Sequence, residues 1–153
     1  MIEFTDASRK QIYYVLRERT NAQGQPLRGL GTDLIISNGA SADRSQSLTI
    51  RLADQYNQTF GRLNLSLRAG SCNQAGGPTR LCATTNIQGR FVNGSTDVCR
   101  QGVATVSGTE RFIHLEQSCA LRQISNCNRP ASVAYHLTID VFAAVFPCTP
   151  LRN

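Results

Sequence analysis

Two short segments in the first half of the chain alternate strictly between apolar and polar residues. The apolar positions are Leu48, Ile50 and Leu52 in residues 47–53, and Leu63, Leu65 and Leu67 in residues 62–68. A period of two predicts β-strands that place one face on a core and leave the other face open. The polar connector over residues 54–59 is short, so we expect the two strands to pair antiparallel.

The N-terminal part of the chain predicts a β-hairpin and a further short strand. Residues 11–19 are rich in β-formers and follow a polar turn at residues 6–8, which favours a hairpin over residues 2–19. A helix over residues 6–21 is the alternative, because Ile12 and Leu16 lie four residues apart. Residues 32–37 predict the next strand.

The second half of the chain is less regular. Short strands fit residues 84–92, 102–106 and 111–115, and a short helix fits residues 115–124. Residues 131–146 are largely apolar, and the four-residue spacing of Leu137, Val141 and Val145 predicts a helix, with a long strand as the alternative. We therefore expect one α+β domain over residues 1–153, with an N-terminal hairpin and an antiparallel sheet before the C-terminal helices. An all-β fold is the alternative.

Charge gives the first indication of a partner. The 153 residues carry 16 Lys and Arg against 10 Asp and Glu, a net charge of +6, and Lys10 is the single Lys. Arg is suited to bidentate phosphate contacts, although a GC-rich genome also favours Arg over Lys. No apolar run approaches the roughly 20 residues of a membrane-spanning helix, and the N-terminus has no signal-peptide pattern. We therefore expect synthesis in the cytoplasm and no membrane partner.

The open face of the two alternating segments is the strongest candidate for a binding surface. It combines arginines with short hydroxyl and amide side chains, and acidic residues are missing from it. The residues on this face are Ser47, Thr49, Arg51, Arg62, Asn64, Ser66 and Arg68. Arginines neutralise phosphates, and single-stranded RNA can place its bases on such a sheet, so the pattern predicts RNA binding. The alternative is an ordinary solvated sheet face.

Six cysteines all follow residue 71, mostly in loops rich in Gly, Asn and Pro. No pair has C-x-x-C spacing and the chain has two histidines, so we expect neither a zinc site nor another cofactor. An even number of cysteines also fits a disulfide framework in an exported protein. The cysteine count therefore leaves the compartment open.

Catalysis has a weak candidate in the two histidines. His114 and His136, assisted by Glu110 or Glu116, would supply the acid and base of a ribonuclease. No phosphate-binding loop, nucleophile-elbow or metalloprotease motif is present in the sequence. We therefore expect a protein that is not an enzyme.

In its order of elements the chain resembles the coat proteins of small single-stranded RNA bacteriophages. The Ser47-x-Thr49-x-Arg51 segment is similar to the RNA-facing strand of that family, and Arg62, Asn64 and Ser66 fall where the neighbouring strand offers its side chains. The resemblance implies a dimer formed by C-terminal helices, a closed icosahedral shell around single-stranded RNA, and a place in the virion. It also implies that the Cys72 and Cys82 loop links neighbouring subunits by disulfides.

One rival structural function remains from the sequence. An exported, disulfide-stabilised β-domain of a surface fibre, pilin-like or adhesin subunit fits the six cysteines.

Overall fold

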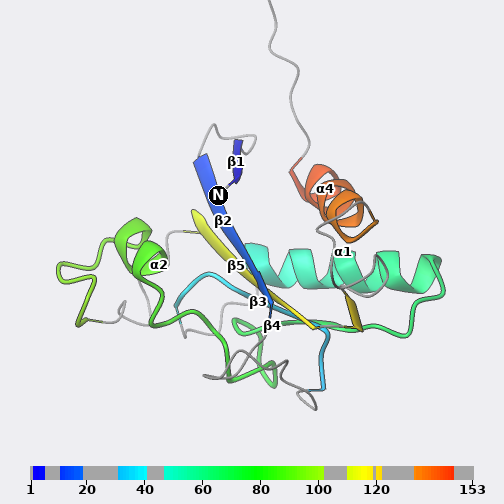
Figure 1. Ribbon diagram of the computed structural model, residues 1–153, viewed down its shortest axis with the longest axis horizontal. Coiled ribbons are helices and arrows are strands. Elements are labelled where there is room, and N and C mark those ends of the chain that lie inside the picture. The colour runs from blue at the N-terminus through cyan, green and yellow to red at the C-terminus, as the bar shows by residue number, and fades with distance from the viewer. Residues whose placement is uncertain are drawn as a thin grey trace, which may run out of the picture.

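The computed structural model describes residues 2–5, 11–18, 31–40, 47–101, 110–118, 120–121 and 133–146, of which residues 2–5, 11–18 and 133–135 are described by their backbone. In chain order the elements are β1 (Ile2–Thr5), β2 (Gln11–Glu18), β3 (Leu34–Ser37), α1 (Leu48–Arg62), β4 (Ala69–Ser71), α2 (Ile87–Val92), β5 (Phe112–Gln117) and α4 (Val133–Val145). The fold is α+β, with α1 and α4 packed beside the sheet and α2 set apart from them (Figure 1). Because two long helices are present, the all-β alternative is wrong.

The five strands form one mixed sheet in the order β1-β2-β5-β3-β4. The pairs β1–β2 and β3–β5 are antiparallel, whereas β2–β5 and β3–β4 are parallel. The expectation of an antiparallel sheet followed by helices is therefore wrong. The reason lies in α1, which connects β3 to β4 and lets these neighbouring strands run in the same direction.

The first alternating segment is the beginning of α1 and not a strand. Ser47 has extended backbone and forms the N-cap, and its hydroxyl accepts a hydrogen bond from the Thr49 N–H. The buried side chains of the whole helix have a helical period, which becomes visible only beyond residue 53. They are Thr49, Ile50, Leu52, Ala53, Tyr56, Thr59 and Phe60. The predicted connector over residues 54–59 lies inside the helix.

The second alternating segment is also not a strand. Arg62 is the last residue of α1, Leu63 is its C-cap, and Asn64 adopts a left-handed conformation with φ of 53°. Leu65 and Leu67 pack against the core, whereas Leu63 is 50% exposed, so the alternation identifies two of its three inward-facing residues correctly. Residues 65–68 nevertheless join no ladder, and β4 begins only at Ala69.

The remaining predictions have mixed outcomes. β1 pairs antiparallel with β2, as expected for the N-terminal segment, so the alternative helix over residues 6–21 is wrong. The strand at residues 32–37 appears as β3, the strand at residues 111–115 as β5, and the helix at residues 131–146 as α4. A strand was expected over residues 84–92, but residues 87–92 form α2, and β5 continues through Gln117 where a helix was expected from residue 115. The expected strand at residues 102–106 lies outside the described residues.

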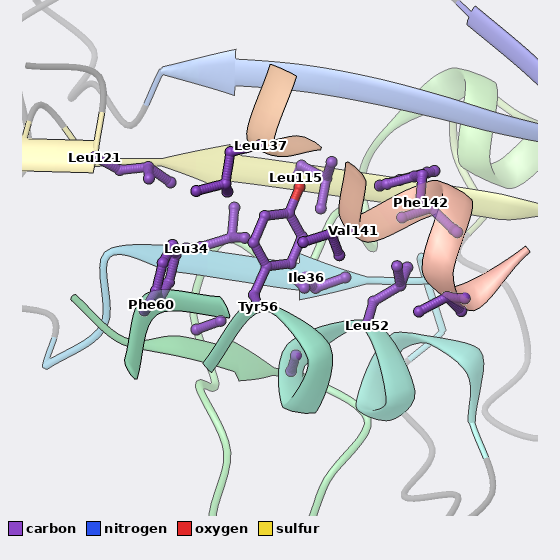
Figure 2. Packing of buried hydrophobic residues seen from close by; sticks show 14 of the residues in the cluster. Leu34, Ile36, Leu52, Tyr56, Phe60, Leu115, Leu121, Leu137, Val141 and Phe142 are labelled. Carbon is purple, nitrogen blue, oxygen red and sulfur yellow. The ribbon is translucent and has the colours of Figure 1, made fainter. Parts of the chain in front are cut away.

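The core lies between one face of the sheet and the two long helices (Figure 2). β3 contributes Leu34 and Ile36, and β5 contributes Ile113 and Leu115. The helix residues that meet them include Leu52, Tyr56 and Phe60 of α1, and Leu137, Val141 and Phe142 of α4. Among the described helices, none is long and apolar enough to cross a membrane.

The opposite face of the sheet carries α2 and the loops that precede it. Gly89 of α2 lies directly on Phe112 of β5, and a Cβ at residue 89 would come within 2.7 Å of the Phe112 ring. The absence of a side chain therefore allows this close approach. At the end of α2 the Asn93 amide donates to the Asn38 carbonyl at 2.9 Å, which fixes the helix to the segment after β3.

Candidate functional site: an outward basic helix face and a polar pocket

The seven residues predicted to bind RNA do not share one sheet face. Ser47 and Thr49 are buried at the start of α1, with exposed fractions of 2% and 0%. Arg51 and Arg62 are exposed on α1, whereas the three remaining residues follow the helix in the loop that leads to β4. The prediction of a common strand face is therefore wrong, because a helical period turns the hydroxyl residues inwards and the arginines outwards.

The buried hydroxyls belong to a hydrogen-bonded polar cluster. Thr49 Oγ1 lies 2.8 Å from Ser71 Oγ and donates to Asn73 Oδ1 at 3.0 Å. Asn73 Nδ2 in turn donates to Asn38 Oδ1 at 2.8 Å. Such buried polar groups need partners, and here each one finds a partner on a different element. The cluster therefore joins α1 to β4 and to the segment after β3, and it keeps these side chains away from solvent.

Glu110 closes this cluster at the N-terminus of α1. Its carboxylate accepts from the Leu48 N–H at 2.9 Å, from Ser47 Oγ at 3.2 Å and from Asn38 Nδ2 at 2.9 Å. A carboxylate at a helix N-terminus satisfies free N–H groups and interacts favourably with the helix dipole. Glu110 is a candidate catalytic assistant from the sequence, but these hydrogen bonds are those of a helix cap.

The outward face of α1 is polar and basic. Arg51, Gln55, Gln58 and Arg62 are spaced by four, three and four residues, so they follow one side of the helix, opposite the buried residues. Arg68 is also exposed and lies six residues after the end of α1. The Asn57 side chain accepts a hydrogen bond from the Ala69 N–H and donates one to the Ala69 carbonyl. These two bonds hold the segment that carries Arg68 against α1.

Exposed cations outnumber exposed acids among the residues whose side chains are described. The exposed arginines are Arg51, Arg62, Arg68, Arg80, Arg100 and Arg111, and the exposed carboxylates are Asp54 and Asp140. This excess gives the described surface a positive field that attracts polyanions.

Cys72 and Cys82 form a disulfide within the chain, with a Cα–Cα distance of 5.7 Å. The expectation that these residues link different subunits is therefore wrong. The two cysteines are ten positions apart, and their bond closes the loop that follows β4. Cys99 is a free, exposed thiol.

The sheet face that carries α2 contains a pocket of about 420 Å³. His114 and Glu116 of β5 line it, with exposed fractions of 3% and 7%, and His114 Nε2 lies 3.4 Å from Glu116 Oε1. The other polar lining residues are Thr85, Asn86 and Gln88, and the apolar ones are Leu81, Ala83 and Ile87. The Phe112 ring lies nearly parallel to the His114 imidazole at a centroid distance of 6.3 Å.

The disulfide holds one wall of this pocket. Cys82 lies between Leu81 and Ala83, and both neighbours have left-handed backbone, with φ of 61° and 55°. Such φ values cost energy in residues other than glycine. The Ser37 hydroxyl of β3 donates to the Cys82 carbonyl, so the covalent bond and this hydrogen bond together maintain the conformation of the wall.

The ribonuclease interpretation requires two histidines in one site, and the structure does not bring them together. His136 is exposed on α4, which packs on the face formed by Ile113 and Leu115, whereas His114 points into the pocket on the other face. His114 and Glu116 remain a close acid–base pair, as the sequence allowed. Within the described ranges, no three His, Cys, Asp or Glu side chains gather as a metal site.

Sequence reasoning missed the pocket and the exposed apolar face of α2. Phe91 and Ile87 are 74% and 53% exposed, which is unusual for side chains of this size. A signal for the pocket was present in residues 112–117, where His114 and Glu116 alternate with Ile113 and Leu115 at strand spacing. No protein-family model, curated protein or solved structure matches the chain.

Proposed function

We propose that the chain is a structural subunit, a coat protein that associates with copies of itself into a closed shell and packages single-stranded RNA. The observation that carries the proposal is the outward face of α1, where Arg51 and Arg62 flank two glutamines. Phosphate contacts need exposed, flexible cations and tolerate any base sequence. The proposed role is not enzymatic, and its place is the virion, after synthesis in the host cytoplasm.

In this proposal RNA binds to the exposed arginines of α1 and of the segment after it, and not to a face of the β-sheet. Arg51, Arg62 and Arg68 contact phosphates from α1 and the segment behind it, while Gln55 and Gln58 offer hydrogen bonds to sugars and phosphates. Ser47 and Thr49 take no part, since both are buried in the polar cluster. Binding of this kind weakens steeply with salt because condensed counterions are released when cations replace them.

Self-association in this proposal uses the apolar residues that α2 leaves exposed. Ile87 and Phe91 are separated by one helical turn, so they form one ridge on the surface. A coat subunit needs such a face for a symmetric partner, and burial of large apolar side chains is the main source of association energy.

Expression of the chain alone in bacteria tests the proposal. We expect closed particles in electron micrographs, and RNA that stays intact when the particles are treated with nuclease. The double variant Arg51→Gln, Arg62→Gln is expected to form particles with less RNA, while Asp54→Asn on the same helix, which removes a negative charge, packages at least as much RNA as the native chain. A soluble monomer without nucleic acid contradicts the proposal.

A second candidate function is supported by the disulfide. An intrachain Cys72–Cys82 bond is typical of proteins that fold in an oxidising compartment, which favours an exported subunit of a surface fibre or adhesin. Lysis of producing cells directly into a thiol-blocking reagent separates the two candidates. Free Cys72 and Cys82 thiols in the cytoplasm agree with the coat protein, whereas a protein found oxidised outside the cytoplasm agrees with the exported subunit.

A further inference from the structure

The two disulfide-bonded cysteines are each attached to β3 by a hydrogen bond that does not involve a sulfur atom. The Cys72 N–H donates to the Ile36 carbonyl at 2.8 Å. The Cys82 carbonyl accepts from the hydroxyl of Ser37, the next residue of β3. The side chain of Asn73, directly after Cys72, belongs to the buried polar cluster. These bonds hold the backbones of the two cysteines near each other whether the sulfurs are bonded or reduced.

The loop between the cysteines turns back through hydrogen-bonded turns that depend on glycine. The Gln74 N–H donates to the Ser71 carbonyl at 3.3 Å, and the Gly77 N–H donates to the Gln74 carbonyl at 2.9 Å. Gly76 has left-handed backbone with φ of 70°, and a Cβ at residue 77 would lie 2.1 Å from the Ser71 carbonyl oxygen. Glycine is therefore favoured at residue 76 and required at residue 77. Because the sequence itself encodes this turn, the reduced chain also brings its two cysteines together.

The surroundings of the sulfur atoms suit a reversible bond. Cys72 and Cys82 are half-buried, so small thiols and disulfides can reach them. Cys82 Sγ lies 3.3 Å from the Pro78 carbonyl oxygen and 3.5 Å from that of Arg80. In the reduced protein these carbonyls can accept a hydrogen bond from the thiol. The same surroundings therefore accommodate the disulfide and the reduced Cys82 thiol.

The oxidation state of the pair affects the segment that leads to α2. Leu81 and Ala83 have left-handed backbone on either side of Cys82, which costs energy in residues that carry a side chain. The Ala83 carbonyl accepts from the N–H of Asn86, the N-cap of α2, at 3.0 Å. Loss of the covalent bond lets the left-handed residues relax, and this hydrogen bond transmits the change to the beginning of α2.

We propose that Cys72 and Cys82 are a reversible redox switch, reduced while the chain is in the cytoplasm and closed to the disulfide after release from the cell. In closure, one cysteine thiolate attacks a low-molecular-weight disulfide, such as glutathione disulfide, and releases one glutathione. The second cysteine then attacks the mixed disulfide and releases the other glutathione. The two protein thiols lose two protons and two electrons, which reduce one glutathione disulfide to two glutathione molecules.

The timing of this switch rests on the proposed function, in which α2 contributes the contact between subunits. A fixed α2 loses less conformational freedom in that contact, so closure strengthens the association without being required for it. The particle is then assembled from reduced subunits and becomes more resistant to dissociation when it enters an oxidising medium.

Cysteine labelling and hydrogen exchange of the full chain test the switch. Producing bacteria are lysed directly into N-ethylmaleimide, and peptide mass spectrometry should find Cys72 and Cys82 alkylated. Chain treated with glutathione disulfide should lose two hydrogen atoms from this pair, and an excess of reduced glutathione should restore them. Exchange across residues 81–88 should be about tenfold slower in the oxidised chain, because local opening is less populated, and equal in the middle of α1.

Two variants assign the response to this pair. Exchange in the double variant Cys72→Ser, Cys82→Ser should not respond to glutathione disulfide, whereas Cys99→Ser should respond like the native chain. The switch is refuted by a pair already oxidised in the cytoplasm, by thiols that glutathione disulfide leaves free, or by equal exchange of residues 81–88 in the two states. A monomer that passes these tests refutes the shell and not the switch, whereas RNA-filled particles that fail them refute the switch alone.

Discussion

The two faces of the sheet differ in what they bury. The face toward α1 and α4 is closed by large apolar side chains, among them Tyr56, Phe60 and Phe142, each exposed by 1% or less. The face toward α2 buries His114 and Glu116. α2 packs on this face through Gly89, and the Cys72–Cys82 disulfide lies in the loops that cover it. The first face provides cohesion, whereas the second places titratable groups next to a pocket, an arrangement that binding sites use and cores avoid.

The largest expected effect separates the core from the exposed side of α2. Phe142→Ala removes a fully buried ring and is expected to lower the free energy of unfolding by about 3–5 kcal/mol. Phe91→Ala removes an identical phenyl ring at a position that is 74% exposed. This variant should change the free energy of unfolding by less than about 0.5 kcal/mol. Urea unfolding followed by circular dichroism measures both. Equal losses for the two variants contradict the assignment of the core.

The next effect concerns the disulfide and the pocket wall. Replacing Cys72 and Cys82 together by Ser is expected to cost about 2–4 kcal/mol, because the unfolded chain gains the freedom that the bond removes. Residues 81–83 then relax from their left-handed conformations, so hydrogen exchange should accelerate across residues 81–88 and stay unchanged in the middle of α1. Cys99→Ser is the matched control. Unaltered exchange in residues 81–88 would show that the disulfide does not support the pocket.

A smaller effect tests the polar cluster against the original sheet hypothesis. Ser47→Ala removes the N-cap of α1 and a bond to Glu110, and we expect a loss of about 1–2 kcal/mol with RNA affinity unchanged. Ser66→Ala removes an exposed hydroxyl and serves as the control, with stability unchanged. The reverse outcome, in which Ser47→Ala is as stable as the native chain and binds RNA less tightly, contradicts the burial of this residue.

The smallest effect on stability belongs to the outward face of α1. The double variant Arg51→Gln, Arg62→Gln is expected to unfold like the native chain, since both side chains are exposed. Filter binding of single-stranded RNA at a series of salt concentrations should show a logarithmic salt slope that is less steep by about 1.4, from two lost phosphate contacts. An unchanged slope means that these two arginines do not touch RNA.

Local patterns in the sequence predict the elements whose period is unambiguous. β3, β5 and α4 were expected at residues 32–37, 111–115 and 131–146, and each of them forms there. The sequence did not predict α1, because residues 47–53 at its start alternate by chance between polar and apolar side chains. The helical period depends on Tyr56, which stood in the segment 54–59 interpreted as a connector, and on Phe60 directly after that segment.

The site depends on contacts that a sequence does not display. Ser47 and Thr49 are buried by the helical period of α1 and by distant partners: Ser47 donates to Glu110, 63 positions away, and Thr49 donates to Asn73. The pocket lies where residues 81–88 cover β5, and the disulfide joins Cys72 and Cys82 across the loop between them. The charge excess was visible from composition, while its placement on α1 required the helix to be known.

Sedimentation velocity of the purified chain, monitored at the absorption maxima of nucleic acid and of protein, tests the proposed function most directly. A basic subunit that assembles around RNA should sediment as one large species in which both signals move together. Disulfide reduction should leave that species intact, because the Cys72–Cys82 bond lies within one subunit. A single slow boundary of monomer size, carrying the protein signal alone, would contradict the account.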